Sequence, residues 1–101
     1  ENIYPAEVEN AIFGHPKITD VAVIGVPDEN WGEAVKAIIV PAMGEQVDEV
    51  DVIAWARERI AGFKCPKSVD VVDALPRNPS GKILKKELRA PYWGDKTRAV
   101  N

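Results

Sequence analysis

The sequence predicts an α+β fold, in which a small three-stranded, mainly antiparallel sheet is covered by about three helices. A length of 101 residues is enough for one domain and leaves too little material for a second core. The predicted elements follow one another in the order helix, two strands, helix, strand, helix. Because three short apolar strands need helices to cover them, we expect an α+β sandwich rather than a doubly wound sheet.

The first helix is predicted over residues 5–13. Proline suits the first helical position, acidic side chains follow in the first turn, and Gly14 and Pro16 end the helix. Its buried face is predicted to carry Val8, Ala11 and Ile12.

Two strands are predicted next, from Val21 to Val26 and from Ala34 to Val40. Both runs are apolar and rich in β-branched residues apart from Lys36, which is typical of strands in a sheet covered on both faces. The connection, residues 27–33, is polar, contains proline and glycine, and is long for a hairpin.

A second helix is predicted from about Asp48 to Ile60, because Asp48 can cap it and apolar residues recur on one face. We expect Gly62 to end it. The apolar face is formed by Val52, Ile53, Ala56 and Ile60.

The rest of the chain contains a short strand, a loop and a last helix. The strand is predicted from Ser68 to Val72, and the loop over residues 76–81. The helix is predicted from Ile83 to Arg89, with Pro91 ending it because proline cannot donate a helical hydrogen bond.

Charge is distributed unevenly along the chain. The net charge is −3, but residues 1–60 carry −8 and residues 61–101 carry +5. Such asymmetry is consistent with an anionic partner and also with ordinary solvated surface charge. Because the whole chain is acidic, with a pI of about 5.1, binding to nucleic acid is disfavoured.

Composition also bears on location. No apolar run approaches the roughly 20 residues needed to span a bilayer, so no transmembrane segment is expected. Cys65 is the single cysteine, so an internal disulfide and a cysteine metal cluster are excluded, and a reducing, cytoplasmic compartment is expected. The first residue is not Met, and we expect the chain to be a fragment of a longer protein.

The densest chemical signal lies in residues 75–82, where two prolines and a glycine define a loop that presents Lys82 next to the last helix. A lysine there can act as a mobile charge beside a phosphate or carboxylate. The spacing of a nucleotide-binding P-loop is absent. From residue types alone, the favoured interpretation of Lys82 is a solvated surface lysine at a helix start. A solvated face is likewise favoured for the basic stripe formed by Lys82, Lys85, Lys86 and Arg89.

Three segments resemble the adenylate-forming enzymes, which include acyl-CoA synthetases, luciferases and peptide-synthetase adenylation domains. Residues 76–89, with Ser-Gly-Lys-Ile-Leu-Lys-Lys at their centre, resemble the family's closing motif. Residues 2–9 resemble the end of the motif that follows the interdomain hinge, and residues 15–28 with Trp31-Gly32-Glu33 resemble the next block. Three matches in order are a specific signal, and they favour the fatty-acyl-CoA ligase branch.

This resemblance implies that residues 1–101 are the small, mobile C-terminal domain of a ligase whose large N-terminal domain is absent from the sequence. In the family, a carboxylic acid reacts with ATP to give an acyl-adenylate, and a thiol, usually coenzyme A, then displaces AMP after the small domain rotates. Lys82 matches the catalytic lysine of the first step. Mg²⁺ is expected with ATP, bound mainly by the absent domain, and the chain alone is expected to be inactive.

The resemblance also suggests a coenzyme A site formed by Trp31, Phe63, Lys64 and Lys67. An aromatic ring can stack on adenine while lysines meet the phosphates. Position 65 often carries a basic residue in the family, and Cys65 supplies no cation there. The alternative is that the aromatic residues pack at the rim of the core and the lysines are solvated.

Other residues are expected to be structural. His15 has a place at a helix end, Cys65 has no identifiable base partner, and Trp55 is expected to pack or to contact the missing domain. Tyr92 and Trp93 are expected in a tail that folds back on this domain or docks on the large one. Two other functions stay open, namely stand-alone binding of anionic ligands and an interaction module without chemistry.

Overall fold

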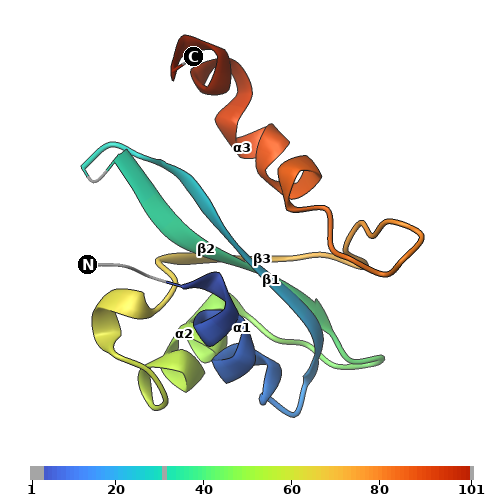
Figure 1. The fold of residues 1–101 in the computed structure, drawn as a ribbon. Coiled ribbons are helices and arrows are strands. Elements are labelled where there is room, and N and C mark those ends of the chain that lie inside the picture. Colours follow the sequence, from blue (N-terminus) through green and yellow to red (C-terminus); the bar gives the residue numbers. More distant parts are fainter. Residues whose placement is uncertain (1–3, 31, 101) are drawn as a thin grey trace.

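A computed structural model describes the backbone of residues 4–30 and 32–100, and the side chains of these residues up to Gly94. It confirms the α+β class, with helices on both faces of a three-stranded sheet (Figure 1). Within the described residues, no helix combines the length and apolar character needed to cross a membrane. The elements are α1 (Pro5–Phe13), β1 (Ile18–Asp28), β2 (Gly32–Pro41), α2 (Glu49–Arg57), the 3-10 turn η1 (Gly62–Lys64), β3 (Ser68–Val71) and α3 (Lys85–Val100).

The sheet has the order β1-β2-β3 and is mixed. The long β1–β2 pair is antiparallel, whereas the short β2–β3 pair is parallel. A parallel pair needs a crossover connection, and the segment that contains α2 and η1 supplies it. The sheet is therefore antiparallel for most of its length, as predicted, with one parallel edge.

The β1–β2 hairpin is tighter than predicted. Pairing continues to Asp28↔Gly32, so Pro27 and Glu33 belong to strands and not to the loop. Pro27 is tolerated because β1 is an edge strand, where a residue without a backbone N–H does not interrupt the sheet. Gly32 has a φ of 79°, a left-handed conformation that glycine adopts without steric cost.

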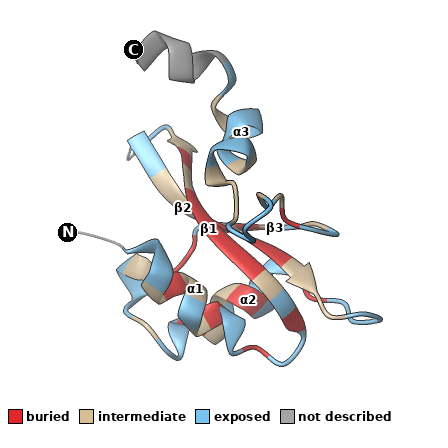
Figure 2. Ribbon diagram, turned by 45° about the vertical axis from the view of Figure 1, so that its right-hand side comes forward, coloured by how far each residue is buried: buried red, intermediate tan, exposed pale blue. Residues whose placement is uncertain are grey.

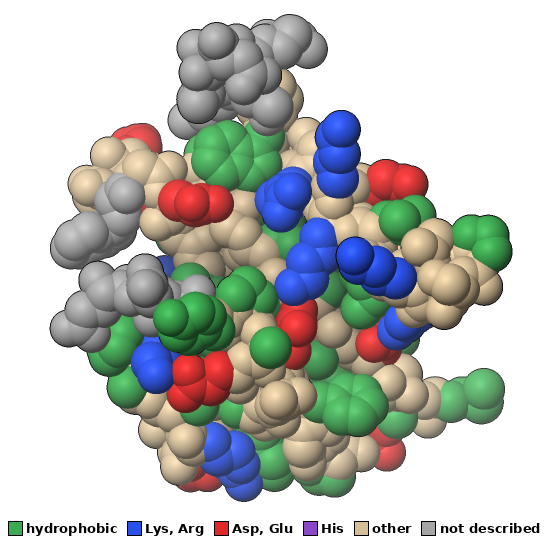
Figure 3. Space-filling model, viewed as in Figure 1, with side chains coloured by type: hydrophobic (Ala, Val, Ile, Leu, Met, Phe, Trp, Pro, Cys, Tyr) green, Lys and Arg blue, Asp and Glu red, His purple; other side chains and the backbone are tan. Residues whose placement is uncertain are grey.

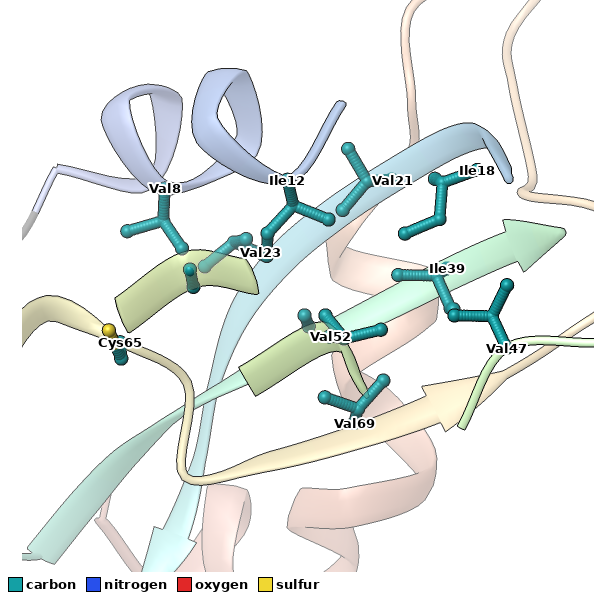
Figure 4. Packing of buried hydrophobic residues seen from close by; sticks show 12 residues of the cluster. Val8, Ile12, Ile18, Val21, Val23, Ile39, Val47, Val52, Cys65 and Val69 are labelled. Carbon is teal, nitrogen blue, oxygen red and sulfur yellow. The ribbon is translucent and has the colours of Figure 1, made fainter. Parts of the chain in front are cut away.

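The sheet buries apolar side chains on both faces, as the apolar strands predicted. Figure 2 shows that the buried residues concentrate along the central part of the strands. On one face, Ile39 and its neighbours pack against α1 and α2. Figure 4 shows the residues of this cluster, with Val8 and Ile12 of α1 lying over Val21 and Val23 of β1. On the other face, Ile38 packs with the chain segments around α3. The opposite-face cluster contains Ala22, Ile24, Val26, Ile38 and Leu75, with Val40, Val72, Ile83, Leu88 and Tyr92 packed against it.

The helix ends differ in part from the predictions. Asp48 caps α2 as expected, its carboxylate accepting the Asp51 N–H at 2.9 Å, but the helix ends at Arg57 rather than near Ile60. α3 begins at Lys85 rather than Ile83, because Ile83 pairs with Arg77 in an isolated bridge.

Pro91 does not end α3, and this prediction was wrong. The backbone departs from helical geometry at Gly94, whose φ is 45°. Tertiary contacts hold the turn after the proline: the Trp93 indole donates to the Gly25 carbonyl at 2.9 Å, and the Tyr92 hydroxyl donates to Asp70. Tyr92 and Trp93 therefore fold back on this domain, which is one of the two alternatives expected for them.

A polar cluster secures α3 to the sheet. Lys36, the one charged residue of the β2 apolar run, is buried and donates to Asp70 at 3.0 Å, with its ammonium 5.1 Å from the centre of the Tyr92 ring. Burial and the neighbouring Asp70 raise the pKa of Tyr92 to about 12. The hydrogen bonds from Tyr92 and Lys36 lower the pKa of Asp70 against the opposing effect of partial burial. Lys36 is thus satisfied by its partners rather than left as an unpaired buried charge.

Candidate functional site

Lys82 lies on a short, closed loop, which we call the Lys82 loop (residues 76–84). Backbone hydrogen bonds close it at its base, where the Leu84 N–H donates to the Pro76 carbonyl at 2.9 Å. Further in, the Asn78 N–H donates to the carbonyl of Lys82, also at 2.9 Å. Both ends of the loop are anchored by apolar residues, since Leu75 is buried and Ile83 packs against the same cluster.

The Asn78 side chain organises the tip of the loop. Its Oδ1 atom accepts hydrogen bonds from the Ser80 N–H at 3.0 Å, the Ser80 hydroxyl at 2.8 Å and the Lys82 N–H at 2.9 Å. Gly81 has a φ of 92°, which favours glycine between Ser80 and Lys82. These contacts fix the backbone of Lys82 while its side chain extends into solvent.

Arg77 connects this loop to the sheet. Its Nη1 donates to the Gly81 carbonyl at 2.6 Å, and its Nη2 donates to Asp20 of β1 at 2.5 Å. Arg77, Asn78 and Asp20 are not among the site residues predicted from the sequence. The Asn-Pro pair before Ser-Gly is a turn signal from which Asn78 was predictable. The contact between Arg77 and Asp20 was not, because it joins residues 57 positions apart.

Lys82 lines an open depression of about 820 Å³. Glu9 lies at its wall, where one carboxylate oxygen accepts from the Val23 N–H at 2.8 Å and from Lys85 at 2.7 Å. Lys82 and Lys86 are exposed and form no ion pair with the described residues. Figure 3 shows Lys and Arg side chains gathered over the start of α3. The depression is lined by Glu9, Arg77, Asn78, Lys82, Ile83, Leu84, Lys85, Lys86 and Glu87.

This geometry suits a single electrostatic task. A free ammonium on a flexible side chain can approach an anion that belongs to another domain, while the braced backbone limits where it can reach. Among the residues that the structure describes, no group of three or more His, Cys, Asp or Glu side chains could hold a metal ion. The loop itself presents the exposed ammonium of Lys82, which can neutralise negative charge.

The second set of predicted site residues lies around η1. Phe63 is 47% exposed, and Lys67 is exposed without an ion pair to any described residue. Lys64 is engaged by Glu7 of α1, with distances of 3.0 and 3.2 Å from its Nζ to the two carboxylate oxygens. Trp31, the remaining member of this set, lies outside the described residues.

The two sets of residues are not brought together. Figure 1 shows η1 and the Lys82 loop at opposite sides of the domain, with the sheet between them. Cys65, next to Lys64, is buried, and burial raises the pKa of its thiol. Its sulfur donates to the Ala61 carbonyl at 3.7 Å, which agrees with a packing role.

His15 and Trp55 form structural contacts, as expected. The Nδ1 atom of His15 accepts the Lys17 N–H at 3.0 Å, so Nε2 carries the proton and donates to Asp51 at 3.0 Å. The Trp55 indole donates to the Ala11 carbonyl at 2.7 Å. These bonds join the end of α1 to α2.

The comparison with known families decides the identity of the domain. The profile of the family described as AMP-binding enzyme C-terminal domain matches residues 7–82, which is more than half of the chain. The chain belongs to this family. The match contains the Lys82 loop up to Lys82 itself and the segment around η1.

Individual relatives agree with this assignment. The fatty acid–[acyl-carrier-protein] ligase ScoC of Streptomyces coeruleorubidus is 48% identical over all 101 residues, which make up 20% of its length. A feruloyl-CoA synthase from an Amycolatopsis species is 57% identical over 91% of this chain and 19% of its own. The crystal structure of ATP-bound MatB from Rhodopseudomonas palustris superposes with a TM-score of 0.87 at 41% identity, over 93% of this chain and 19% of MatB. The chain thus spans about a fifth of the length of these relatives.

Proposed function

We propose that this AMP-binding C-terminal domain is the small mobile domain of an ATP-dependent ligase that joins a carboxylic acid to a thiol, with a fatty acid and coenzyme A as substrate and acceptor. The observation that carries the proposal is the exposed ammonium of Lys82, which forms no ion pair with the described residues and lies on a braced loop beside an open depression. The names of two relatives support it, since one is a fatty acid ligase and the other a CoA synthase. A large N-terminal domain would then hold ATP, Mg²⁺ and the acid.

In the first step, a carboxylate oxygen attacks the α-phosphorus of ATP and the bond to pyrophosphate breaks. Negative charge accumulates as the two anions meet, and the Lys82 ammonium would offset it there. The depression is open toward solvent, so this group is accessible to a second domain. Lys82 would contribute charge and position, while the acid pocket belongs to the other domain.

In the second step, the η1 side of the domain would face the thiol acceptor. Phe63 and Lys67 are exposed and available to an adenine ring and a phosphate. Lys64 would exchange its ion pair with Glu7 for a phosphate, or hold η1 against α1. Because η1 and the Lys82 loop lie at opposite sides of the domain, one pose cannot present both to one active centre, which supports rotation between the steps.

The proposal is tested by acid-dependent exchange of pyrophosphate into ATP. The full-length protein should catalyse this exchange with a fatty acid, whereas the purified 101-residue chain should not, because the proposed nucleotide and acid pockets lie outside it. Exchange by the 101-residue chain alone would contradict the proposal that the nucleotide and acid pockets belong to the large domain. A full-length protein that exchanges with no carboxylic acid tested would contradict the function itself.

A second prediction concerns the acceptor. Replacing both Lys64 and Lys67 with glutamine in the full-length enzyme should raise the KM for coenzyme A and leave the rate of adenylation unchanged. Since contacts between charge and phosphate are screened by salt, the KM of the variant should also depend less on ionic strength than that of the parent. Steady-state kinetics at several salt concentrations would measure both effects.

Pantetheine provides the control for this prediction, because it has the thiol but lacks the nucleotide and its phosphates. The parent and the double variant should use it equally well. The single variants separate the two lysines: if Lys64 mainly holds η1 against Glu7, only Lys67→Gln should change the KM for coenzyme A. Equal losses with pantetheine and coenzyme A would assign the lysines to the domain interface.

A further inference from the structure

The tip of the Lys82 loop must be held in a defined direction if Lys82 is to reach a reacting group. The tip of the loop, residues 79–82, is exposed. The apolar residues that anchor the loop lie outside this tip, Leu75 before it and Ile83 after it. The contacts of Asn78 fix the internal shape of the tip but do not attach it to the rest of the domain. The base of the loop is anchored, and a contact from the tip itself to the sheet would further limit the direction in which the tip points.

The side chain of Arg77 supplies this contact. One arm of its guanidinium donates to the carbonyl of Gly81, the residue before Lys82, at 2.6 Å, and the other arm reaches Asp20 at 2.5 Å. Such a fork is specific to arginine, because a lysine ammonium on a single stem lacks two rigid, separated donors. Arg77 thus ties the peptide adjoining Lys82 directly to β1.

Asp20 is itself held in place. Its Oδ1 atom accepts the Val21 N–H at 3.0 Å, which leaves Oδ2 for Arg77. The register of β1 against β2 shifts between Ile18 and Asp20, so this carboxylate lies at an irregular point of an edge strand. The side chain of Asp20 is 24% exposed and that of Arg77 is 42% exposed. A continuous path of polar contacts therefore runs from the backbone of β1 through Asp20 and Arg77 to the backbone beside Lys82.

We propose that Asp20 and Arg77 are positioning residues for Lys82, which orient its loop so that the ammonium reaches the reacting phosphate and carboxylate. This inference rests on the proposed ligase function and adds two residues to the machinery of its first step. An ion pair this exposed contributes little to the stability of the fold. A displacement of about 1 Å at a catalytic group, by contrast, can cost about 10²-fold in rate.

A direct role for Arg77 is the competing explanation, because its side chain also lines the depression. Asp20 separates the two roles. If Arg77 bound phosphate itself, the neighbouring carboxylate would compete with that phosphate, and Asp20→Asn should leave adenylation unchanged or tighten the binding of ATP. If Arg77 positions the loop, Asp20→Asn should slow adenylation at an unchanged KM for ATP.

The experiment measures the two half-reactions of the full-length enzyme separately, in single-turnover conditions, for Asp20→Asn, Arg77→Lys, Arg77→Ala and the double variant Asp20→Asn/Arg77→Ala. Adenylation should slow by about 10-fold in Asp20→Asn and by up to about 10²-fold in Arg77→Ala. The double variant should be no slower than Arg77→Ala, because both changes break one path. Arg77→Lys should recover little of the loss, since it keeps the charge but not the fork.

Three other readouts distinguish positioning from general damage. Thioester formation from supplied acyl-adenylate and the melting temperature should stay close to those of the parent. Hydrogen exchange should rise in the peptide that contains the Lys82 loop and not elsewhere. Glu45→Gln is the matched control, because it weakens an exposed pair with Lys17, at 4.0 Å, that has no connection to this loop.

The outcomes also separate this inference from the proposed function. If the parent forms no acyl-adenylate, the proposed function fails and the positioning role, which rests on it, fails with it. If the parent forms acyl-adenylate, Lys82→Ala slows its formation and Asp20→Asn behaves like Glu45→Gln, the function stands and the positioning role is overturned. Tighter binding of ATP by Asp20→Asn would also overturn it, in favour of a direct role for Arg77.

Discussion

Replacing Lys82 with alanine in the full-length enzyme should slow acyl-adenylate formation by about 10²–10³-fold, the usual effect of losing one electrostatic contact to a transition state. The side chain is exposed and forms no ion pair with the described residues, so its removal leaves no partner unsatisfied. Thioester formation from supplied acyl-adenylate should therefore remain nearly intact. Single-turnover measurements of the two half-reactions check both statements.

Lys86→Ala is the matched control for this prediction, because Lys86 is an exposed lysine that lines the same depression. Lys86→Ala should slow acyl-adenylate formation much less than Lys82→Ala does, if the position of the lysine matters more than the total positive charge. Lys82→Gln, which keeps the stem but not the charge, should behave like Lys82→Ala. An equal loss in both half-reactions of Lys82→Ala would indicate global damage, and an equal loss in Lys86→Ala would indicate a general basic surface.

The fold was predictable where local signals and packing agree. Pro5 and Gly14 mark the two ends of α1, and Asp48 caps α2, because these positions need particular backbone or side-chain chemistry. Pro91 was misleading because a lost helical hydrogen bond can be outweighed by tertiary contacts. In this domain, the hydrogen bonds of Tyr92 and Trp93 to residues of the sheet are these tertiary contacts. The parallel pairing of β3 was also beyond local signals, since it depends on where the crossover returns the chain.

The site was predictable as a motif but not as a set of partners. Lys82 stands out because the residues around it define a loop and resemble a known motif. The contact between Arg77 and Asp20, which holds the Lys82 loop, was not predictable in this way, and neither was the ion pair between Lys64 and Glu7. Each contact joins residues that are 57 positions apart in the sequence. Surface charges of this kind have many possible partners, and only the packing of the elements selects one. The acidic first part of the chain thus supplies counter-charges to the basic second part.

Both faces of the sheet should contribute to stability, but we expect only one of them to support the Lys82 loop. Adjacent residues of β2 test this expectation. Ile38 and Ile39 are 1% and 0% exposed but belong to opposite clusters. Each change to alanine should lower the free energy of unfolding of the 101-residue chain by about 2–5 kcal/mol, from lost burial and the cavity left behind. Urea denaturation would measure both values.

A control variant and a measurement of adenylation distinguish the effects of Ile38→Ala and Ile39→Ala. Val71→Ala, at a residue that is 50% exposed on β3, should change the free energy of unfolding by no more than about 1 kcal/mol. Ile38 packs in the cluster that also contains Leu75 and Ile83, the apolar anchors of the Lys82 loop, whereas Ile39 packs with α1 and α2. In the full-length enzyme, Ile38→Ala should therefore slow adenylation more than Ile39→Ala does at equal loss of stability. If Ile38→Ala behaved like Val71→Ala in the unfolding experiment, α3 and the Lys82 loop would not cover the sheet as a core, and the argument that the sheet positions Lys82 would fail.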